Sequence, residues 1–99
     1  MTVIERDVFQ AKYGRGDDLV ALFQGARELM GEHGRSEYRI LTDLAGEFFT
    51  VVVEFEWESL GQMETERDAT FADPRFQEWF SKMPELVESG RRELFTVVE

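Results

Sequence analysis

A chain of 99 residues can bury a single hydrophobic core, and residues 1–99 are expected to form one domain. Acidic residues outnumber basic ones by 21 to 11, and the net charge of −10 argues against nucleic acid or an anionic membrane surface as partner. The lack of cysteine excludes disulfides, thiolate metal ligands and a cysteine nucleophile, and it fits a reducing compartment. No run approaches the ~20 apolar residues of a membrane span, and residues 1–7 do not resemble a signal peptide, so a cytoplasmic location is expected.

The first third of the chain predicts a strand followed by a helix. Residues 3–12 are expected to form the strand, and Tyr13-Gly14-Arg15-Gly16 has the composition of a turn. Between residues 17 and 30, apolar side chains recur at helical spacing and form one stripe: Leu19, Leu22, Phe23, Ala26, Leu29 and Met30. Glycines 31 and 34 are expected to end this helix.

Residues 48–57 are the most β-prone run and predict a long central strand. Because side chains alternate along a strand, one of its faces is wholly apolar and carries Phe49, Val51, Val53, Phe55 and Trp57. The other face is half apolar and half acidic, with Phe48, Thr50, Val52, Glu54 and Glu56.

Residues 35–42 predict the strand before it, and residues 43–46 predict the turn of an antiparallel hairpin, in which Gly46 can adopt positive φ. We expect Thr42 to lie opposite Glu47, because this register sets apolar residues against each other. The register places Tyr38 and Ile40 on the wholly apolar face, and it pairs Leu41 with Phe48, Arg39 with Thr50, Glu37 with Val52 and Arg35 with Glu54.

The last third predicts two helical segments and a strand. Ser59-Leu60-Gly61-Gln62 matches a capping box, and Asp73-Pro74 starts a second helical segment with an Asp cap and Pro at the first helical position. Pro84 is expected to break or bend the last turn, and Ser89-Gly90 to close the segment. Residues 91–98 predict the final strand.

This order, strand–helix–strand–strand–helix–strand, is that of the ferredoxin-like βαββαβ arrangement, an α+β fold. Right-handed crossovers place both helices on one face of a four-stranded antiparallel sheet, with the first and third strands in its centre. The other face, which carries Leu41, Phe48, Thr50 and Val52, then stays uncovered in a single chain. A second copy of the same sheet is its simplest cover, so a homodimer is expected.

The pattern resembles the dimeric α+β barrel proteins, which include antibiotic-biosynthesis-monooxygenase-like and NIPSNAP-like families. The resemblance is carried by the turn at residues 13–18, the hairpin at residues 40–46 with the long strand after it, and the segment at residues 73–80. It implies a homodimer whose facing sheets enclose a barrel. Some members are cofactor-free oxygenases, and others bind haem through a histidine on the second helix. This chain has no histidine between Ser59 and Gly90, so no cofactor is expected.

Arg39 is the leading candidate for a binding residue, because the predicted register places a cation beside Thr50 on the uncovered, partly apolar face. Such a cation can hold an acidic or phenolic aromatic compound, or it can pair with an acidic residue across a dimer interface. The residues predicted to line the cavity are therefore Arg39, Leu41, Phe48, Thr50, Val52 and Glu54.

Three other patterns favour structural roles. His33, the single histidine, is expected in a solvent-exposed turn, and no metal site is expected without further ligands. Glu54, Glu56 and Glu58 can be paired carboxylates, but are more typical of a solvated sheet end or of pairs with Arg35, Arg91 and Arg92. Gly14-Arg15-Gly16 lacks the lysine and third glycine of a phosphate loop.

Two classes of function follow. The first is a homodimeric module that binds a small molecule between its facing sheets and has no chemistry of its own. The alternative is a cofactor-independent monooxygenase or isomerase that acts on a small aromatic substrate. The sequence shows no nucleophile with an adjacent base, so catalytic residues are not assigned.

Overall fold

The computed structural model describes residues 1–34 and 37–99, and its elements follow the predicted order. The strands are β1 (Val3–Ala11), β2 (Arg39–Thr42), β3 (Thr50–Trp57) and β4 (Val87–Thr96). Each predicted helical region is divided: α1 (Gly16–Gly25) is followed by α2 (Arg27–Glu32), and α3 (Leu60–Phe71) is followed by α4 (Pro74–Phe80) and the short 3₁₀-helix η1 (Met83–Glu85).

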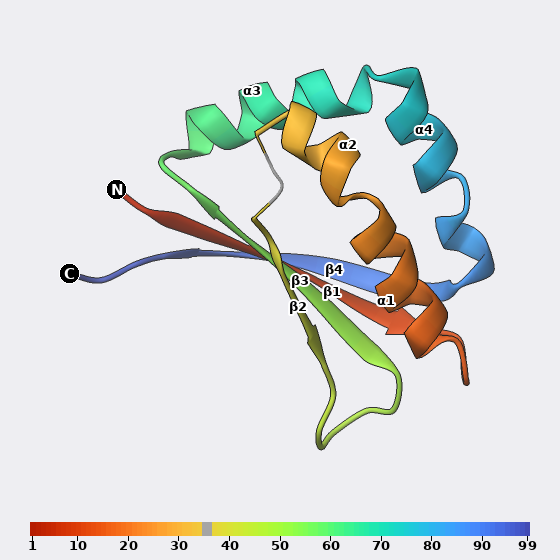
Figure 1. The fold of residues 1–99 in the computed structure, drawn as a ribbon. Coiled ribbons are helices and arrows are strands. Elements are labelled where there is room, and N and C mark those ends of the chain that lie inside the picture. The colour runs from red at the N-terminus through yellow and green to blue at the C-terminus, as the bar shows by residue number, and fades with distance from the viewer. Residues whose placement is uncertain (35–36) are drawn as a thin grey trace.

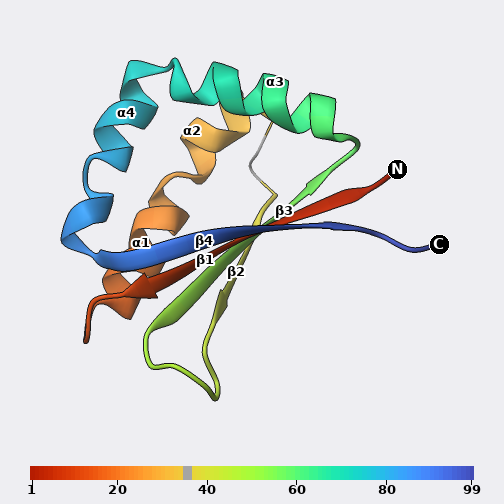
Figure 2. The ribbon, with the colours of Figure 1, turned by 180° about the vertical axis from the view of Figure 1, so that it is seen from behind.

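The four strands form one antiparallel sheet in the order β2-β3-β1-β4, so the first and third strands are central as predicted. All helices lie on one side of this twisted sheet, and no element covers the other side within the described residues (Figure 1). The reverse view shows the chain ends close together at one end of the sheet (Figure 2). The ferredoxin-like α+β arrangement is therefore confirmed. None of the helices in the described part of the chain is long and apolar enough to cross a membrane.

The core lies between the sheet and the helices, where the wholly apolar face of β3 is buried as predicted. Val51 and Val53 are at most 1% exposed, and Phe55 and Trp57 pack beside them. Burying a valine in this way stabilises a fold by about 1.5 kcal/mol. The helices contribute Leu19, Phe23, Met30, Met63 and Phe76 to the same core.

The predicted register of the β2–β3 hairpin is wrong by four residues. Thr42 lies opposite Val51 rather than Glu47, Leu41 opposite Val52, and Arg39 opposite Glu54. The connection is longer than expected, because Phe48 and Phe49 belong to it and not to the strand. Phe49 has a positive φ of 59° and Gly46 one of 110°, and Thr50 N–H donates to Asp43 Oδ1 at 3.0 Å. An even shift keeps every side chain on its predicted face. The predicted pair of Arg35 with Glu54 involves a residue outside the described ones.

Other predicted boundaries also differ, and β2 begins at Arg39 rather than at residue 35. The first helix is interrupted at Ala26, next to Gly25, whose low helix propensity favours a break there. The last strand begins at Val87, four residues before its predicted start, so Ser89-Gly90 lie inside β4. A Cβ atom at position 90 would lie 3.1 Å from the Phe9 ring, and glycine therefore allows β4 to approach β1 closely.

The predicted helix starts are confirmed. Ser59 Oγ accepts a hydrogen bond from Gln62 N–H at 3.1 Å and caps α3. Asp73 Oδ1 accepts one from Arg75 N–H at 2.9 Å and caps α4, with Pro74 at the first helical position. Pro84 lies in η1, after α4 has ended at Phe80, as the expected break requires.

Candidate functional site

The uncovered side of the sheet, which we call the open face, carries the side chains that alternate away from the helices. By strand register these are Ile4, Arg6, Val8 and Gln10 on β1, Arg39 and Leu41 on β2, Thr50, Val52, Glu54 and Glu56 on β3, and Ser89, Arg91, Glu93 and Phe95 on β4. Val8, Val52 and Leu41 lie side by side across its strands, and the next row is charged, with Arg6, Glu54 and Arg39. Phe95, in the row beyond, remains 48% exposed. The face is thus partly apolar and lacks a cover in the single chain.

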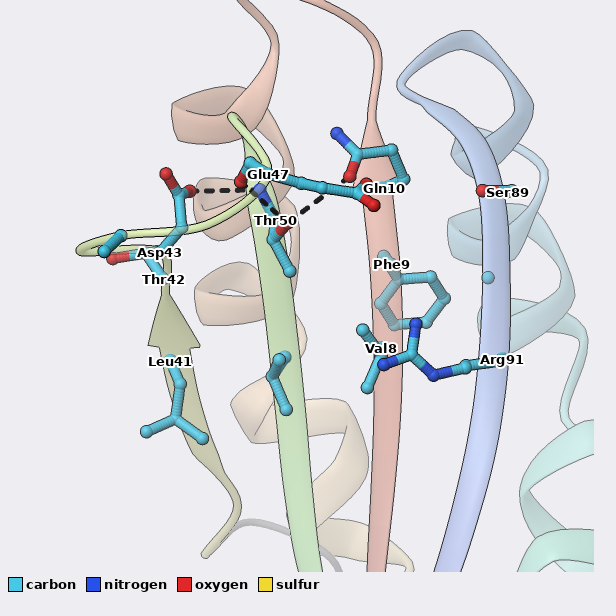
Figure 3. A pocket seen from close by; sticks show the side chains of 13 residues that line it. Val8, Phe9, Gln10, Leu41, Thr42, Asp43, Glu47, Thr50, Ser89 and Arg91 are labelled. Atoms are coloured by element: carbon cyan, nitrogen blue, oxygen red, sulfur yellow. Dashed lines mark hydrogen bonds between the residues drawn. The ribbon is translucent and has the colours of Figure 1, made fainter.

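One end of the open face contains a hollow of about 520 Å³, the open-face hollow (Figure 3). Leu41, Val8 and Val52 supply apolar lining, and Gln10, Thr50 and Arg91 supply polar groups. Thr50 Oγ1 donates either to Gln10 Oε1, at 3.3 Å, or to the Glu47 carbonyl, at 3.0 Å. Its lining therefore combines apolar contacts with a few oriented polar groups, as ligand sites do.

Beside the hollow, Glu54 is held by two arginines. Arg6 Nη2 lies 3.1 Å from Glu54 Oε2, and Arg39 Nη2 donates a hydrogen bond to Glu54 Oε1. The hydrogen bond from Arg39 is the main cause that lowers the pKa of Glu54, with Arg6 adding to it. Arg39 keeps 71% of its side chain exposed, so its charge is accessible although it is paired within its own chain.

The structure brings together three of the six predicted cavity residues. Leu41, Thr50 and Val52 line the open-face hollow. Arg39 and Glu54 lie farther along the same face as an ion pair. Phe48 is 70% exposed in the loop before β3, where its carbonyl accepts a hydrogen bond from Gln10 Nε2.

Two further predictions about charged residues are corrected. His33 is only partly exposed, with 19% of its side chain accessible, and its Nε2 lies 3.0 Å from Asp73 Oδ2, which joins the end of α2 to the cap of α4. Arg91 and Arg92 are not the partners of Glu54, Glu56 or Glu58, and Arg35 lies outside the described residues. The expected solvated sheet end is confirmed for Glu56 and Glu58. Arg91 pairs with Glu93 and Arg92 with the carboxylates of β1, while Glu56 and Glu58 are exposed. Among the described residues, no three His, Cys, Asp or Glu side chains gather in a way that would hold a metal ion.

Sequence reasoning missed a pair of carboxyl groups on the helix side of β1. Glu5 is 2% exposed, and its Oε1 accepts a hydrogen bond from Trp57 Nε1 at 3.0 Å. Asp7 lies next to it, and Arg92 Nε is 3.3 Å from Asp7 Oδ1 and 3.5 Å from Glu5 Oε2. Burial, followed by the hydrogen bond with Glu5, raises the pKa of Asp7 to about 7.

The signal for this pair was present in the strand alternation. Val3, Glu5, Asp7, Phe9 and Ala11 share one face of β1, and its apolar members pack into the core. Two acidic residues between apolar ones on a core-facing side predict buried carboxyl groups, which are costly and therefore mark candidate sites.

Solved structures share this fold at low sequence identity. A NIPSNAP family protein from Agrobacterium tumefaciens superposes with a TM-score of 0.87 at 16% identity, over 100% of this chain and 95% of that one. An uncharacterised NIPSNAP domain protein from Burkholderia xenovorans gives 0.86 at 14%, over 97% and 94%. An antibiotic-biosynthesis-monooxygenase-like protein from Deinococcus radiodurans gives 0.72 at 19%, over 98% and 93%.

No protein-family model and no curated protein sequence matches the chain. At these identities the likeness is one of fold. The chain therefore has the ferredoxin-like α+β fold of NIPSNAP family and monooxygenase-like proteins, as the resemblance in its sequence implied.

Proposed function

We propose that the protein is a homodimer in which the open faces of two sheets pack against each other and bind a small molecule between them. The observation that supports this proposal best is the uncovered face itself (Figures 1 and 2), on which Leu41 is 38% and Phe95 48% exposed. Monomeric proteins rarely leave a contiguous apolar face of a sheet in water.

The size of the face supports a stable pairing. Four strands about 4.8 Å apart and about 26 Å long give a face of roughly 500 Å². Two such faces would together bury about 1,000 Å², which reaches the lower limit of specific protein–protein interfaces. Because both partners use the same patch, the pairing would be two-fold symmetric.

The charge on the face supports the same pairing. The strand residues of the open face include three arginines and three glutamates: Arg6, Arg39, Arg91, Glu54, Glu56 and Glu93. These strand positions are therefore neutral in a chain whose net charge is −10. Glu54 already has two arginine partners, so covering the face does not leave the Glu54 carboxylate buried and unpaired.

The small molecule is placed in the open-face hollow, where an aromatic ring would contact Leu41 and Val52, and a polar group would reach Thr50 or Gln10. An acidic or phenolic group needs a cation. Arg39 is occupied by Glu54, whereas Arg91 lines the hollow and makes only an exposed pair with Glu93, of the kind that contributes about 0–1 kcal/mol. Arg91 can therefore turn to an acidic ligand at lower cost than Arg39.

Sedimentation at micromolar concentration tests the dimer. The expected result is a species of twice the chain mass of 11.6 kDa, and a single species at the chain mass would contradict the proposal.

A thermal-shift screen of acidic and phenolic aromatic compounds tests the ligand. A compound at a hundredfold over its Kd should stabilise the protein by about 2.7 kcal/mol. The shift should fall in Arg91→Ala and in Thr50→Ala, and a screen without any shift would remove the ligand from the proposal.

A further inference from the structure

A second cavity lies on the other side of the sheet, between the strands and the helices. Its volume is about 330 Å³, at the lower end of the range for ligand pockets, so it suits a molecule of one or two rings. Aromatic side chains are the largest group in its lining, among them Phe9, Phe23, Phe55, Phe76 and Trp79. The rings hold one another in place, with centroids 5.4 Å apart for Phe9 and Phe23 and 5.2 Å apart for Phe23 and Trp79.

The Glu5 and Asp7 carboxyl groups line the same cavity. Burial, followed by the neighbouring Glu5 carboxyl group, raises the pKa of Asp7 to about 7, so Asp7 keeps its proton below that pH. Trp57 Nε1 donates to Glu5 Oε1 at 3.0 Å, which holds that carboxyl group in place beside Asp7. A protonated Asp7 next to a second carboxyl group places a proton donor and a proton acceptor side by side, which acid–base catalysis needs.

The charges that face the pair come from two other elements. Arg92 of β4 contacts both carboxyl groups, and Arg67 of α3 lines the cavity without an ion pair to any described residue. Arg91 also lines it, but its charged group pairs with Glu93. One carboxylate and the Arg92 guanidinium cancel, so a neutral substrate would leave no unpaired charge at the carboxyl pair.

We propose that this cavity is a catalytic site in which the Glu5–Asp7 pair interconverts the keto and enol forms of a small aromatic carbonyl compound. The Glu5 carboxylate removes a proton from the carbon next to the carbonyl, and the electrons of that C–H bond form the C=C bond. The carbonyl π electrons take the proton of the Asp7 carboxylic acid, which gives the enol. The pair has then gained one proton and lost one, and a proton shift between the two carboxyl groups restores it.

The reaction as written is balanced and needs no oxidant. It does not depend on the proposed dimer, because the cavity and the open-face hollow lie on opposite sides of the sheet. A monomeric protein that is active here would contradict the dimer alone. A dimer without this activity would contradict this inference alone.

The test follows hydrogen–deuterium exchange next to the carbonyl group by proton NMR in D₂O, with the neutral ketones 2-tetralone and 1-phenylpropan-2-one as probes. We expect the wild-type protein to accelerate exchange of at least one probe about tenfold or more over buffer, in a saturable way. Glu5→Gln and Asp7→Asn preserve shape but cannot exchange the proton, and they should return the rate to that of buffer. Asp68→Asn, an exposed change of the same kind on α3, should keep the wild-type rate.

The pH profile of the wild-type protein provides a second measurement that does not depend on how the variants fold. The rate above buffer should fall as the pH rises through about 7, where the raised pKa of Asp7 removes its proton. Exchange no faster than buffer for both probes would overturn the proposal. So would folded Glu5→Gln and Asp7→Asn proteins that are as fast as wild type, or an enzymatic rate that does not fall across that pH range.

Discussion

Arg39 and Glu54 lie directly opposite each other on β2 and β3, and the Arg39 guanidinium donates a hydrogen bond to Glu54 Oε1. Arg6, which lies opposite Glu54 on β1, approaches the other oxygen at 3.1 Å. One carboxylate with 9% exposure therefore joins three neighbouring strands. It stabilises the register on both sides of β3, because a slip of either neighbour would separate the charges.

Glu54→Gln should lower the free energy of unfolding by about 1 kcal/mol, because the two arginines would share a neutral amide. Glu93→Gln, which removes the exposed partner of Arg91, should change it by less than about 0.5 kcal/mol. Urea unfolding at neutral pH measures both. Equal losses would show that the Glu54 ion pairs stabilise the fold no more than the exposed Arg91–Glu93 pair does.

The difference in unfolding free energy between Glu54→Gln and wild type should depend on pH. The hydrogen bond from Arg39 lowers the pKa of Glu54 below its ordinary value of 4.5 in the folded chain. The stabilisation is therefore present above pH 4.5 and is lost as the pH falls through the folded-state pKa. The difference between Glu54→Gln and wild type should shrink on acidification, and a difference that grows would contradict this sign.

Val52→Asp tests the open face as an interface. Val52 lies on the open face, whereas Val51 is 1% exposed under the helices. In a face-to-face dimer Val52→Asp would bury an unpaired charge, which costs several kcal/mol and should dissociate the assembly. Val51→Thr should leave the assembly intact and lower stability by about 1–2 kcal/mol. Sedimentation and unfolding of both variants decide the matter, and a Val52→Asp protein that remains dimeric would show that the open face is not the interface.

The sequence predicted element types, their order and the faces of the strands, because each depends on a local period of apolar residues. The hairpin register could not be predicted in this way. It depends on Phe49, a bulky residue in the left-handed region, whose conformation no turn rule suggests. The Glu54 pair with Arg6 depends on the β1–β3 register, which joins residues 48 positions apart. The burial of Glu5 and Asp7 could have been predicted by the same alternation rule, because these residues share the face of β1 that carries its core residues.

Replacement by alanine should have opposite effects on stability at a helical glycine, Gly61, and at a glycine with positive φ, Gly46. At Gly61, in the first turn of α3, a Cβ atom would meet only Ser59 Oγ at 3.8 Å, so Gly61→Ala should raise stability by about 0.5–1 kcal/mol. At Gly46 the φ of 110° is open to glycine but strained for alanine, so Gly46→Ala should lower stability by about 1–3 kcal/mol. Thermal unfolding of both variants measures the contrast, and a stabilising Gly46→Ala would contradict the assigned loop conformation.

Asp7→Asn should change how stability depends on pH. In wild type the pKa of Asp7 is about 7 in the folded chain and near its ordinary 3.8 in the unfolded chain. Between these values the folded state binds more protons than the unfolded state, so stability falls as the pH rises from about 4 to 7, by up to about 1.4 kcal/mol per unit. Asparagine does not titrate, so the variant should lose this decline and become more stable than wild type above pH 7. Asp68→Asn, with its side chain in solvent, should keep the wild-type decline. Chemical unfolding at several pH values measures the three slopes, and equal slopes for wild type and Asp7→Asn would show that Asp7 ionises as freely in the folded chain as in the unfolded one.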